Sequence, residues 1–196
     1  EWYGGPGFGI GRCRPLLVNR ASQPAWNEDR TQCIFFHGEL FGYQELKRSM
    51  ERAGHRFSDD SNAEFVVHLY EDRGNAFVRG LNGSFALALW DSRQQRLVIA
   101  NDRYSLCPLY TAQSDGRYVW ASAPKGILAD TTFSRRVNLA ALADFLCLGI
   151  PQGRDTMFEG IDELPPASLV ICQDGQVRCH HYWGLRFQEE ETGIGA

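Results

Sequence analysis

His37-Gly38-Glu39 combines three groups that could hold a small polar molecule, directly after the apolar run CIFF at residues 33–36. A glycine lets a ligand approach the backbone N–H, a glutamate can bind an ammonium group, and a histidine can donate a hydrogen bond to an oxyanion. The pattern therefore indicates a strand that ends in a ligand-binding turn. A bulged strand end with solvated polar side chains is the alternative, and the triplet taken alone favours that alternative.

Two other polar residues could belong to such a site. Arg14 lies beside a glycine-rich stretch and could bind a carboxylate through two parallel hydrogen bonds, although a single arginine is more often part of a surface ion pair. Asn62 falls at the start of an expected helix, where it could hold a ligand or contribute to the helix cap.

Covalent and metal chemistry have weaker support in the sequence. Cys13 and Cys107 are the cysteines that look least buried, but neither has a neighbouring base that would make it a nucleophile. His180 and His181 are adjacent on an expected strand, so their side chains point to opposite faces and we expect no metal site there. Nucleotide binding has no support either, because the sequence contains neither GxGxxG nor GxxxxGK[ST].

The composition is that of a globular protein with one core: 196 residues, 43% of them hydrophobic and 22% charged. The net charge is −4 and no basic stripe is present, which argues against a nucleic-acid partner. Apolar runs reach about eight residues against the roughly 20 that a membrane-spanning helix needs, and no signal peptide is recognisable. We therefore expect a cytoplasmic protein, with its six cysteines as buried, reduced thiols because CxxC spacing is absent.

The periodicity of apolar residues predicts an α+β protein. Helices are expected at 43–53, at 61–73 behind a capping box of Ser61 and Glu64, and at 139–148 with residues 139, 142, 143 and 146 on one apolar face. Strands are expected at 14–18, 33–40, 84–90, 96–102, 108–113 and 117–122, followed by a hairpin at 168–183 that turns at Asp174-Gly175. This grouping favours helices outside largely antiparallel sheets.

Taken in order, several segments resemble a known family. They are GFGIGRCRPLLVNRASQPAWNED, CIFFHGELFGYQEL, GHRFSDDSNAEFVVHLYEDRG, LNGSFALALWD, RLVIANDRYSLCPLY, ASAPKGIL and MFEGIDELPPASL. Together they are similar to the N-terminal domain of glutamine-dependent asparagine synthetases, a class II glutamine amidotransferase of the Ntn-hydrolase superfamily. The resemblance covers residues 7 to about 183. It implies a four-layer αββα sandwich of two largely antiparallel sheets.

The resemblance also implies a glutamine pocket. The family arginine that binds the glutamine carboxylate falls on Arg14, with Leu17 and Val18 in the same segment. The family turn Asn-Gly-Glu, whose Asn and Gly form the oxyanion hole and whose Glu binds the amino group, falls on His37-Gly38-Glu39. The aspartate that shares this amino group falls on Asn62.

In the family, an N-terminal cysteine attacks the glutamine amide with its own α-amino group as base. The released ammonia travels to a second, ATP-using synthetase domain. By this resemblance residues 1–186 form the amidotransferase-like domain and residues 187–196 a linker toward the synthetase domain. ATP and magnesium would belong to that synthetase domain, and no cofactor is expected in the present chain.

The chain departs from the family pattern where the chemistry occurs. Residue 1 is Glu, so the nucleophilic cysteine is absent from these residues. His37 replaces the oxyanion asparagine, and the loss of such a donor typically costs about 10²–10³ in rate. Asn62 replaces the aspartate and removes a charge that would face the glutamine ammonium. The segment 101–110 and Ala123 also differ, whereas scaffold positions such as Gly83 and Asp102 fit.

Two functions compete at this point. One is an active glutaminase domain of an asparagine synthetase, with its cysteine upstream of residue 1. The other is a degenerate amidotransferase domain that serves as a structural or docking module in an ATP-dependent amide-forming ligase. β-Lactam synthetases and lasso-peptide cyclases resemble this arrangement. We favour the second, with glutamine as a weak ligand, the synthetase domain as partner and a family-like homodimer as a further partner to test. A Met-Cys-Gly start in the full open reading frame would favour the first.

Overall fold

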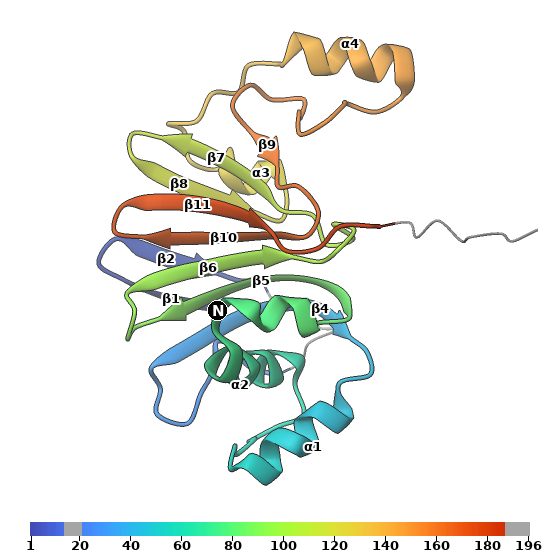
Figure 1. The fold of residues 1–196 in the computed structure, drawn as a ribbon. Helices are drawn as coiled ribbons and strands as arrows, with labels where there is room; N and C mark the ends of the chain where they lie inside the picture. Colours follow the sequence, from blue (N-terminus) through green and yellow to red (C-terminus); the bar gives the residue numbers. More distant parts are fainter. Residues whose placement is uncertain (14–20, 187–196) are drawn as a thin grey trace, which may run out of the picture.

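The computed structural model describes residues 1–13 and 21–186, which form layers of sheet and helix (Figure 1). At the centre is a six-stranded sheet with the strand order β11-β10-β6-β5-β4-β3, in which every neighbouring pair is antiparallel. Its strands are β3 (Ala25–Trp26), β4 (Gln32–Leu40), β5 (Gly83–Asp91), β6 (Arg96–Asn101), β10 (Ser168–Gln173) and β11 (Gln176–His181).

Two smaller antiparallel groups and a few helices complete the fold. The order β8-β7-β9 forms a three-stranded sheet, and β1 pairs with β2 in a hairpin. These strands are β1 (Trp2–Gly5), β2 (Phe8–Gly11), β7 (Tyr110–Ser114), β8 (Arg117–Ala121) and β9 (Asp162–Glu163). The helices are α1 (Gln44–Ala53), α2 (Asn62–Arg73), the 3-10 helix η1 (Gly74–Gly80), α3 (Pro124–Ile127) and α4 (Leu139–Leu148).

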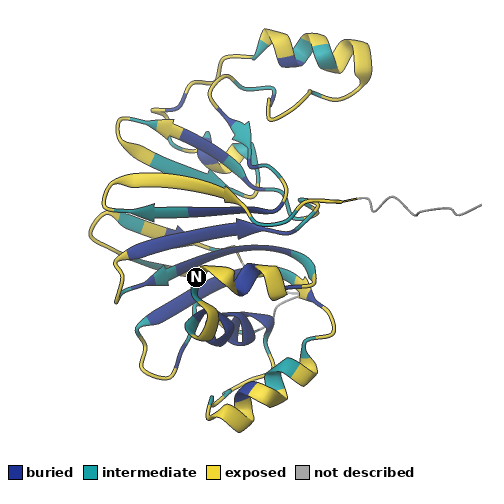
Figure 2. Ribbon diagram, viewed as in Figure 1, coloured by how far each residue is buried: buried dark blue, intermediate teal, exposed yellow. Residues whose placement is uncertain are grey.

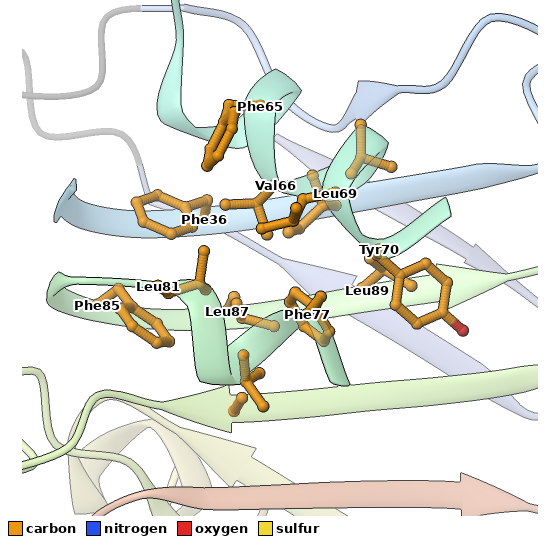
Figure 3. Close-up of a cluster of buried hydrophobic side chains, with 14 of the residues drawn as sticks. Phe36, Phe65, Val66, Leu69, Tyr70, Phe77, Leu81, Phe85, Leu87 and Leu89 are labelled. Carbon is orange, nitrogen blue, oxygen red and sulfur yellow. The ribbon is translucent and has the colours of Figure 1, made fainter. Parts of the chain in front are cut away.

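One face of the six-stranded sheet is covered by α2 and η1 (Figure 3). The side chains that pack there include Phe36, Phe65, Val66, Leu69, Tyr70, Phe77, Leu81, Phe85, Leu87 and Leu89. Residues 62–70 of α2 are all buried, and Figure 2 shows this helix and the central strands as the most enclosed part of the molecule. Helix α2 can therefore place polar side chains inside the protein only where partners or ligands satisfy them.

The other face of the sheet packs on the second layer of strands. Phe35, Ala88 and Ile99 from this face share a core with Leu109 and Leu164 from segments next to β7 and β9. A third cluster joins β7 to α3 on the far side of the small sheet and contains Ala112, Ile127, Phe133 and Ile161. The order of layers is thus helix, sheet, sheet, helix, which confirms the predicted αββα architecture. The apolar character of 84–90 on both faces is explained because β5 is covered from both sides.

Most regular elements lie where the sequence predicts them, including the three helices and the hairpin that turns at Asp174-Gly175. The strand expected at 14–18 lies outside the described residues. The β1–β2 hairpin, β3, η1, α3 and β9 are additional. These elements are short or rich in glycine, so they give little periodicity.

The predicted capping box is half right. The Ser61 hydroxyl accepts a hydrogen bond from the backbone N–H of Glu64 at 3.1 Å, as expected. The Glu64 carboxylate, however, does not return to Ser61; it accepts from the backbone N–H groups of Ser58 and Asp59 at 2.6 and 2.7 Å. The N–H of Ser61 donates to Asp59 instead, at 2.7 Å. Two hydrogen bonds to consecutive N–H groups of the preceding loop stabilise the Glu64 carboxylate more than a single bond to the N–H of Ser61 would.

Two burial predictions are wrong. The cysteines are all free, but only Cys33 is buried, whereas Cys107 and Cys172 are partly buried and Cys13, Cys147 and Cys179 are exposed. The apolar face of α4 is not packed: Leu139 is 73% exposed and Leu146 74%. Figure 1 shows α4 projecting from the layered body of the domain. No helix in the described part of the chain is long and apolar enough to cross a membrane.

Candidate functional site

Two of the residues expected to bind glutamine, Glu39 and Asn62, line a pocket of about 450 Å³ at the start of α2. Its wall comes from the end of β4, the start of α1 and the loop before α2. The lining residues are Ala21, Gln23, Glu39, Leu40, Tyr43, Gln44, Asp59, Asp60, Ser61 and Asn62. A hollow of about 580 Å³ between the β1–β2 turn and the β10–β11 turn is larger, but none of the predicted site residues lines it.

Glu39 and Asn62 meet directly in this pocket. The Asn62 amide nitrogen donates to a Glu39 carboxylate oxygen at 2.8 Å and lies 3.5 Å from the Gly38 carbonyl oxygen. Asn62 is buried as the first residue of α2, while Glu39 is exposed. The Glu39 carboxylate thus already has a neutral hydrogen-bond donor within the protein.

Gly38 is required by the sheet itself. The strand expected at 33–40 is confirmed as β4, so His37, Gly38 and Glu39 lie inside the strand, paired with residues 84–86 of β5, and do not form a turn at its end. Gly38 has φ +112°, and a Cβ there would lie 2.0 Å from the Ser84 carbonyl oxygen. Close approach of β5 therefore excludes every side chain at this position.

His37 is exposed and does not line the pocket. It is adjacent to Gly38 on β4, opposite Ala86. The structure thus brings Glu39 and Asn62 together but leaves the His37 imidazole outside their contact. Arg14, Leu17 and Val18 lie outside the described residues, so their places in the site stay predictions.

Acidic residues before α2 form a part of the pocket that sequence reasoning missed. Glu64 holds the loop through Ser58 and Asp59, and Lys47 forms an ion pair with Asp60. Burial raises the pKa of Asp59, but hydrogen bonds from the Ser61 side chain and backbone outweigh it and leave this pKa below its usual value. The run of acids in DDSNAE was the available signal. Its meaning depends on a loop geometry that periodicity does not give.

The two candidate nucleophiles are not activated in any evident way. Burial raises the pKa of the Cys107 thiol, whose sulfur lies 3.2 Å from the Ser84 hydroxyl. A reactive cysteine needs a lowered pKa, so Cys107 is a partly buried scaffold residue. Cys13 is exposed. His180 and His181 are exposed on β11 and belong to none of the potential metal-binding groups found among the described residues.

Comparisons with known proteins identify the family. The model of the glutamine amidotransferase domain matches residues 5–183. Glutamine-hydrolyzing asparagine synthetase 3 of Bacillus subtilis (strain 168) is 30% identical over 186 residues, which cover 93% of this chain and 30% of that protein. Asparagine synthetase 2 of the same organism is 32% identical over 144 residues, covering 73% of this chain and 19% of that protein.

Solved structures agree at the level of the fold. The glutamine phosphoribosylpyrophosphate amidotransferase from B. subtilis superimposes with a TM-score of 0.60 at 19% identity, covering 89% of this chain and 35% of that chain. The layered fold is thus shared with a glutamine amidotransferase. The chain belongs to the glutamine amidotransferase domain family and is related to asparagine synthetases. It spans less than a third of the length of the two synthetases given above.

Proposed function

We propose that this domain is a glutaminase-silent amidotransferase domain that serves as a docking module in a cytoplasmic, ATP-dependent amide-forming ligase. The observation that supports this proposal is the hydrogen bond from Asn62 to Glu39 in the pocket where a glutamine amino group would be held. The Glu39 carboxylate is therefore satisfied when the pocket is empty.

The altered pocket argues for weak glutamine binding. In the family pattern a second carboxylate would share the ammonium group with Glu39, whereas here the partner is the neutral amide of Asn62. An incoming ammonium group must displace this amide from Glu39. It then contacts one carboxylate, where the family pattern offers two. A charge-assisted hydrogen bond contributes roughly 1.5–3 kcal/mol, so the loss corresponds to about 10- to 100-fold in affinity.

The oxyanion position argues for slow chemistry even when glutamine binds. An imidazole at position 37 has a different reach from an asparagine amide, and His37 does not line the pocket. Donors that stabilise an oxyanion must lie within hydrogen-bond distance of the developing charge, and the loss of one costs roughly 10²–10³ in rate.

The docking role is supported by α4. Four large apolar side chains of α4 are exposed, and so is Ile150 just after the helix; the four are Leu139, Phe145, Leu146 and Leu148. An apolar surface of this kind is typical of an interface. We propose that the synthetase domain of a longer protein covers it, since the curated relatives extend far beyond the matched region.

The test uses the protein encoded by the full open reading frame. We expect no ammonia release from glutamine above a heat-denatured control. By calorimetry, we expect a dissociation constant for glutamine in the millimolar range or weaker. Turnover above the control would overturn the proposal and favour the active glutaminase, which the retained Gly38 and Glu39 support.

A double variant separates the pocket from other causes. His37→Asn with Asn62→Asp restores the family residues, and we expect it to bind glutamine at least tenfold more tightly than the parent. Equal affinity would mean that these two residues are not what weakens binding. His180→Gln, on the exposed β11, is the matched control and should leave glutamine affinity unchanged.

A further inference from the structure

A second group of polar side chains meets around the middle of α2, away from the residues that line the amidotransferase pocket. Glu28 comes from the loop after β3, His55 follows the end of α1, and His68 and Glu71 lie one turn apart on α2. Each offers one nitrogen or oxygen atom, and these four atoms all lie within 4.8 Å of one another. Three segments that are distant in sequence therefore converge on one point.

The spacing of these atoms suits a metal ion. Glu28 Oε1 lies 3.3 Å from His55 Nδ1, and Glu28 Oε2 lies 3.2 Å from His68 Nδ1. Glu71 Oε2 lies 3.9 Å from the same nitrogen of His68. In a tetrahedral site with bonds of about 2.0–2.2 Å, neighbouring ligand atoms are separated by about 3.3–3.6 Å. Small rotations of the side chains would bring the four atoms into that arrangement.

The hydrogen bonding of the cluster is incomplete. His68 is 1% exposed, yet its ring nitrogens donate or accept no well-aligned hydrogen bond among the described residues, and Nδ1 has only the ion-pair contacts with Glu28 and Glu71. His55 Nδ1 and Glu71 Oε2 are also buried without one in the described part of the chain. Buried polar atoms normally have partners, and here three of the four unpartnered atoms belong to the converging set. A bound cation would satisfy those three atoms at once.

Further contacts hold the same side chains in place. His55 Nε2 lies 3.0 Å from Asp72 Oδ1, an arrangement that turns Nδ1 toward the cluster. Glu71 Oε1 accepts from the Asn27 amide at 3.1 Å, and Glu28 Oε1 accepts from the Arg56 backbone N–H at 3.0 Å. Such supporting contacts are typical of metal ligands, because they fix the orientation of the coordinating atom.

We propose that Glu28, His55, His68 and Glu71 form a structural site for a divalent transition-metal ion, with Zn²⁺ as the expected occupant. Two imidazoles and two carboxylates form a donor set that zinc accepts, and four protein ligands leave no coordination position for a substrate. The site would fasten the loop after β3 and the segment between α1 and α2 to α2. It would stabilise the folded domain, because the metal binds a geometry that the unfolded chain lacks.

The experiment measures zinc binding to the full-length protein after dialysis against a chelator. We expect one equivalent of zinc per chain and a rise in melting temperature on addition of ZnCl₂. His55→Gln and Glu71→Gln should each weaken zinc binding at least 100-fold. Glu71→Gln keeps an oxygen for Asn27, so it is the variant of choice should the histidine variant fail to fold. His180→Gln, which changes an exposed histidine on β11, should bind zinc as the parent does.

Two further readouts identify the ligands. Asp72→Asn should weaken binding about tenfold without changing the stoichiometry, because Asp72 positions His55 and does not touch the ion. The Co²⁺-loaded protein should show visible d–d bands without a thiolate-to-cobalt charge-transfer band, since the cluster contains no cysteine. The proposal is overturned by the absence of a zinc-dependent shift in melting temperature, by unchanged affinity in both ligand variants, or by a thiolate band that reveals binding at cysteines.

Discussion

Helix α2 carries buried polar groups in its first turn and again around its middle, and the hydrogen bonding of the two groups differs. In the first turn, the Asn62 amide donates to Glu39, and the Glu64 carboxylate accepts from the N–H groups of Ser58 and Asp59. Around the third turn, both ring nitrogens of His68 and one oxygen of Glu71 lack hydrogen-bond partners in the described part of the chain. The same helix thus carries one network that is complete and one that is incomplete.

This difference in hydrogen bonding indicates which of the two networks needs a ligand. A complete network fixes a loop and gives up no hydrogen bond when the pocket is empty, so the pocket at the start of α2 needs no ligand to satisfy its polar groups. An incomplete buried network lacks stabilisation until something binds to it. The polar residues at the start of α2 therefore hold one another without a ligand, whereas the cluster outside the pocket has the features of a binding site. Four predictions test this comparison.

The largest loss of stability is expected from Gly38→Ala. The new Cβ would lie 2.0 Å from the Ser84 carbonyl oxygen in a backbone with φ +112°, so β4 and β5 would have to separate. We expect a loss of roughly 3 kcal/mol or more in the free energy of unfolding, measured by urea denaturation. Gly42→Ala is the control: its φ is +68° but its Cβ meets nothing within 4 Å, so about 1 kcal/mol is expected. Equal losses would mean that the sheet does not require glycine at position 38.

The second prediction compares the two glutamates directly. Glu64→Gln turns an amide toward the N–H groups of Ser58 and Asp59 and should cost about 2 kcal/mol. Glu71→Gln keeps the oxygen that accepts from Asn27 and should cost less than about 0.5 kcal/mol in the presence of a chelator. Both values come from urea denaturation without metal. Similar costs for the two variants would contradict the view that only the first network is complete.

The third prediction concerns the contact that characterises the pocket. Asn62→Asp replaces the donor to Glu39 with a second carboxylate, so a hydrogen bond becomes a repulsion between like charges. We expect a loss of about 1 kcal/mol in the free energy of unfolding at neutral pH. Saturating glutamine should recover part of this loss, because its ammonium group would lie between the two carboxylates. A variant as stable as the parent would show that the amide contributes nothing at this place.

The sequence predicts those features that depend on residues close together in the chain, and it misses those that depend on contacts between distant segments. The helices and most strands come from local periodicity, and the α2 boundary from Ser61 and Gly74. Gly38, Glu39 and Asn62 were singled out because the family resemblance places them in one site, and the structure brings the last two within 2.8 Å. The role of each stays a prediction.

Other features depend on long-range placement that no local pattern gives. The metal-binding candidates at 28, 55, 68 and 71 come from three segments, and their spacing matches no motif. The sequence therefore predicted no metal site, and only the convergence around α2 suggests one. The exposure of α4 is missed for a related reason: an apolar helix face indicates that something covers it, not that the same domain does.

The smallest effect is expected from Asp59→Asn, and it depends on pH. Burial raises the pKa of Asp59, but hydrogen bonds from Ser61 outweigh it and hold this pKa below the ordinary 3.8. A carboxyl group with a lowered pKa in the folded state stabilises it above the unfolded pKa, and this contribution disappears as the pH falls through the folded value. The amide oxygen of the variant would still accept from the Ser61 N–H, and the site is largely exposed. We therefore expect a loss of only about 0.3 kcal/mol at pH 7.

Parallel urea denaturation of the parent and Asp59→Asn at several pH values checks this. The difference in free energy of unfolding should be constant from pH 7 to pH 5 and should vanish toward pH 2, because the parent then carries a neutral carboxyl group as well. A difference that persists at low pH would mean that Asp59 acts through the shape of the loop and not through its charge. The hydrogen-bond network at the first turn of α2 would then not depend on the negative charge of Asp59.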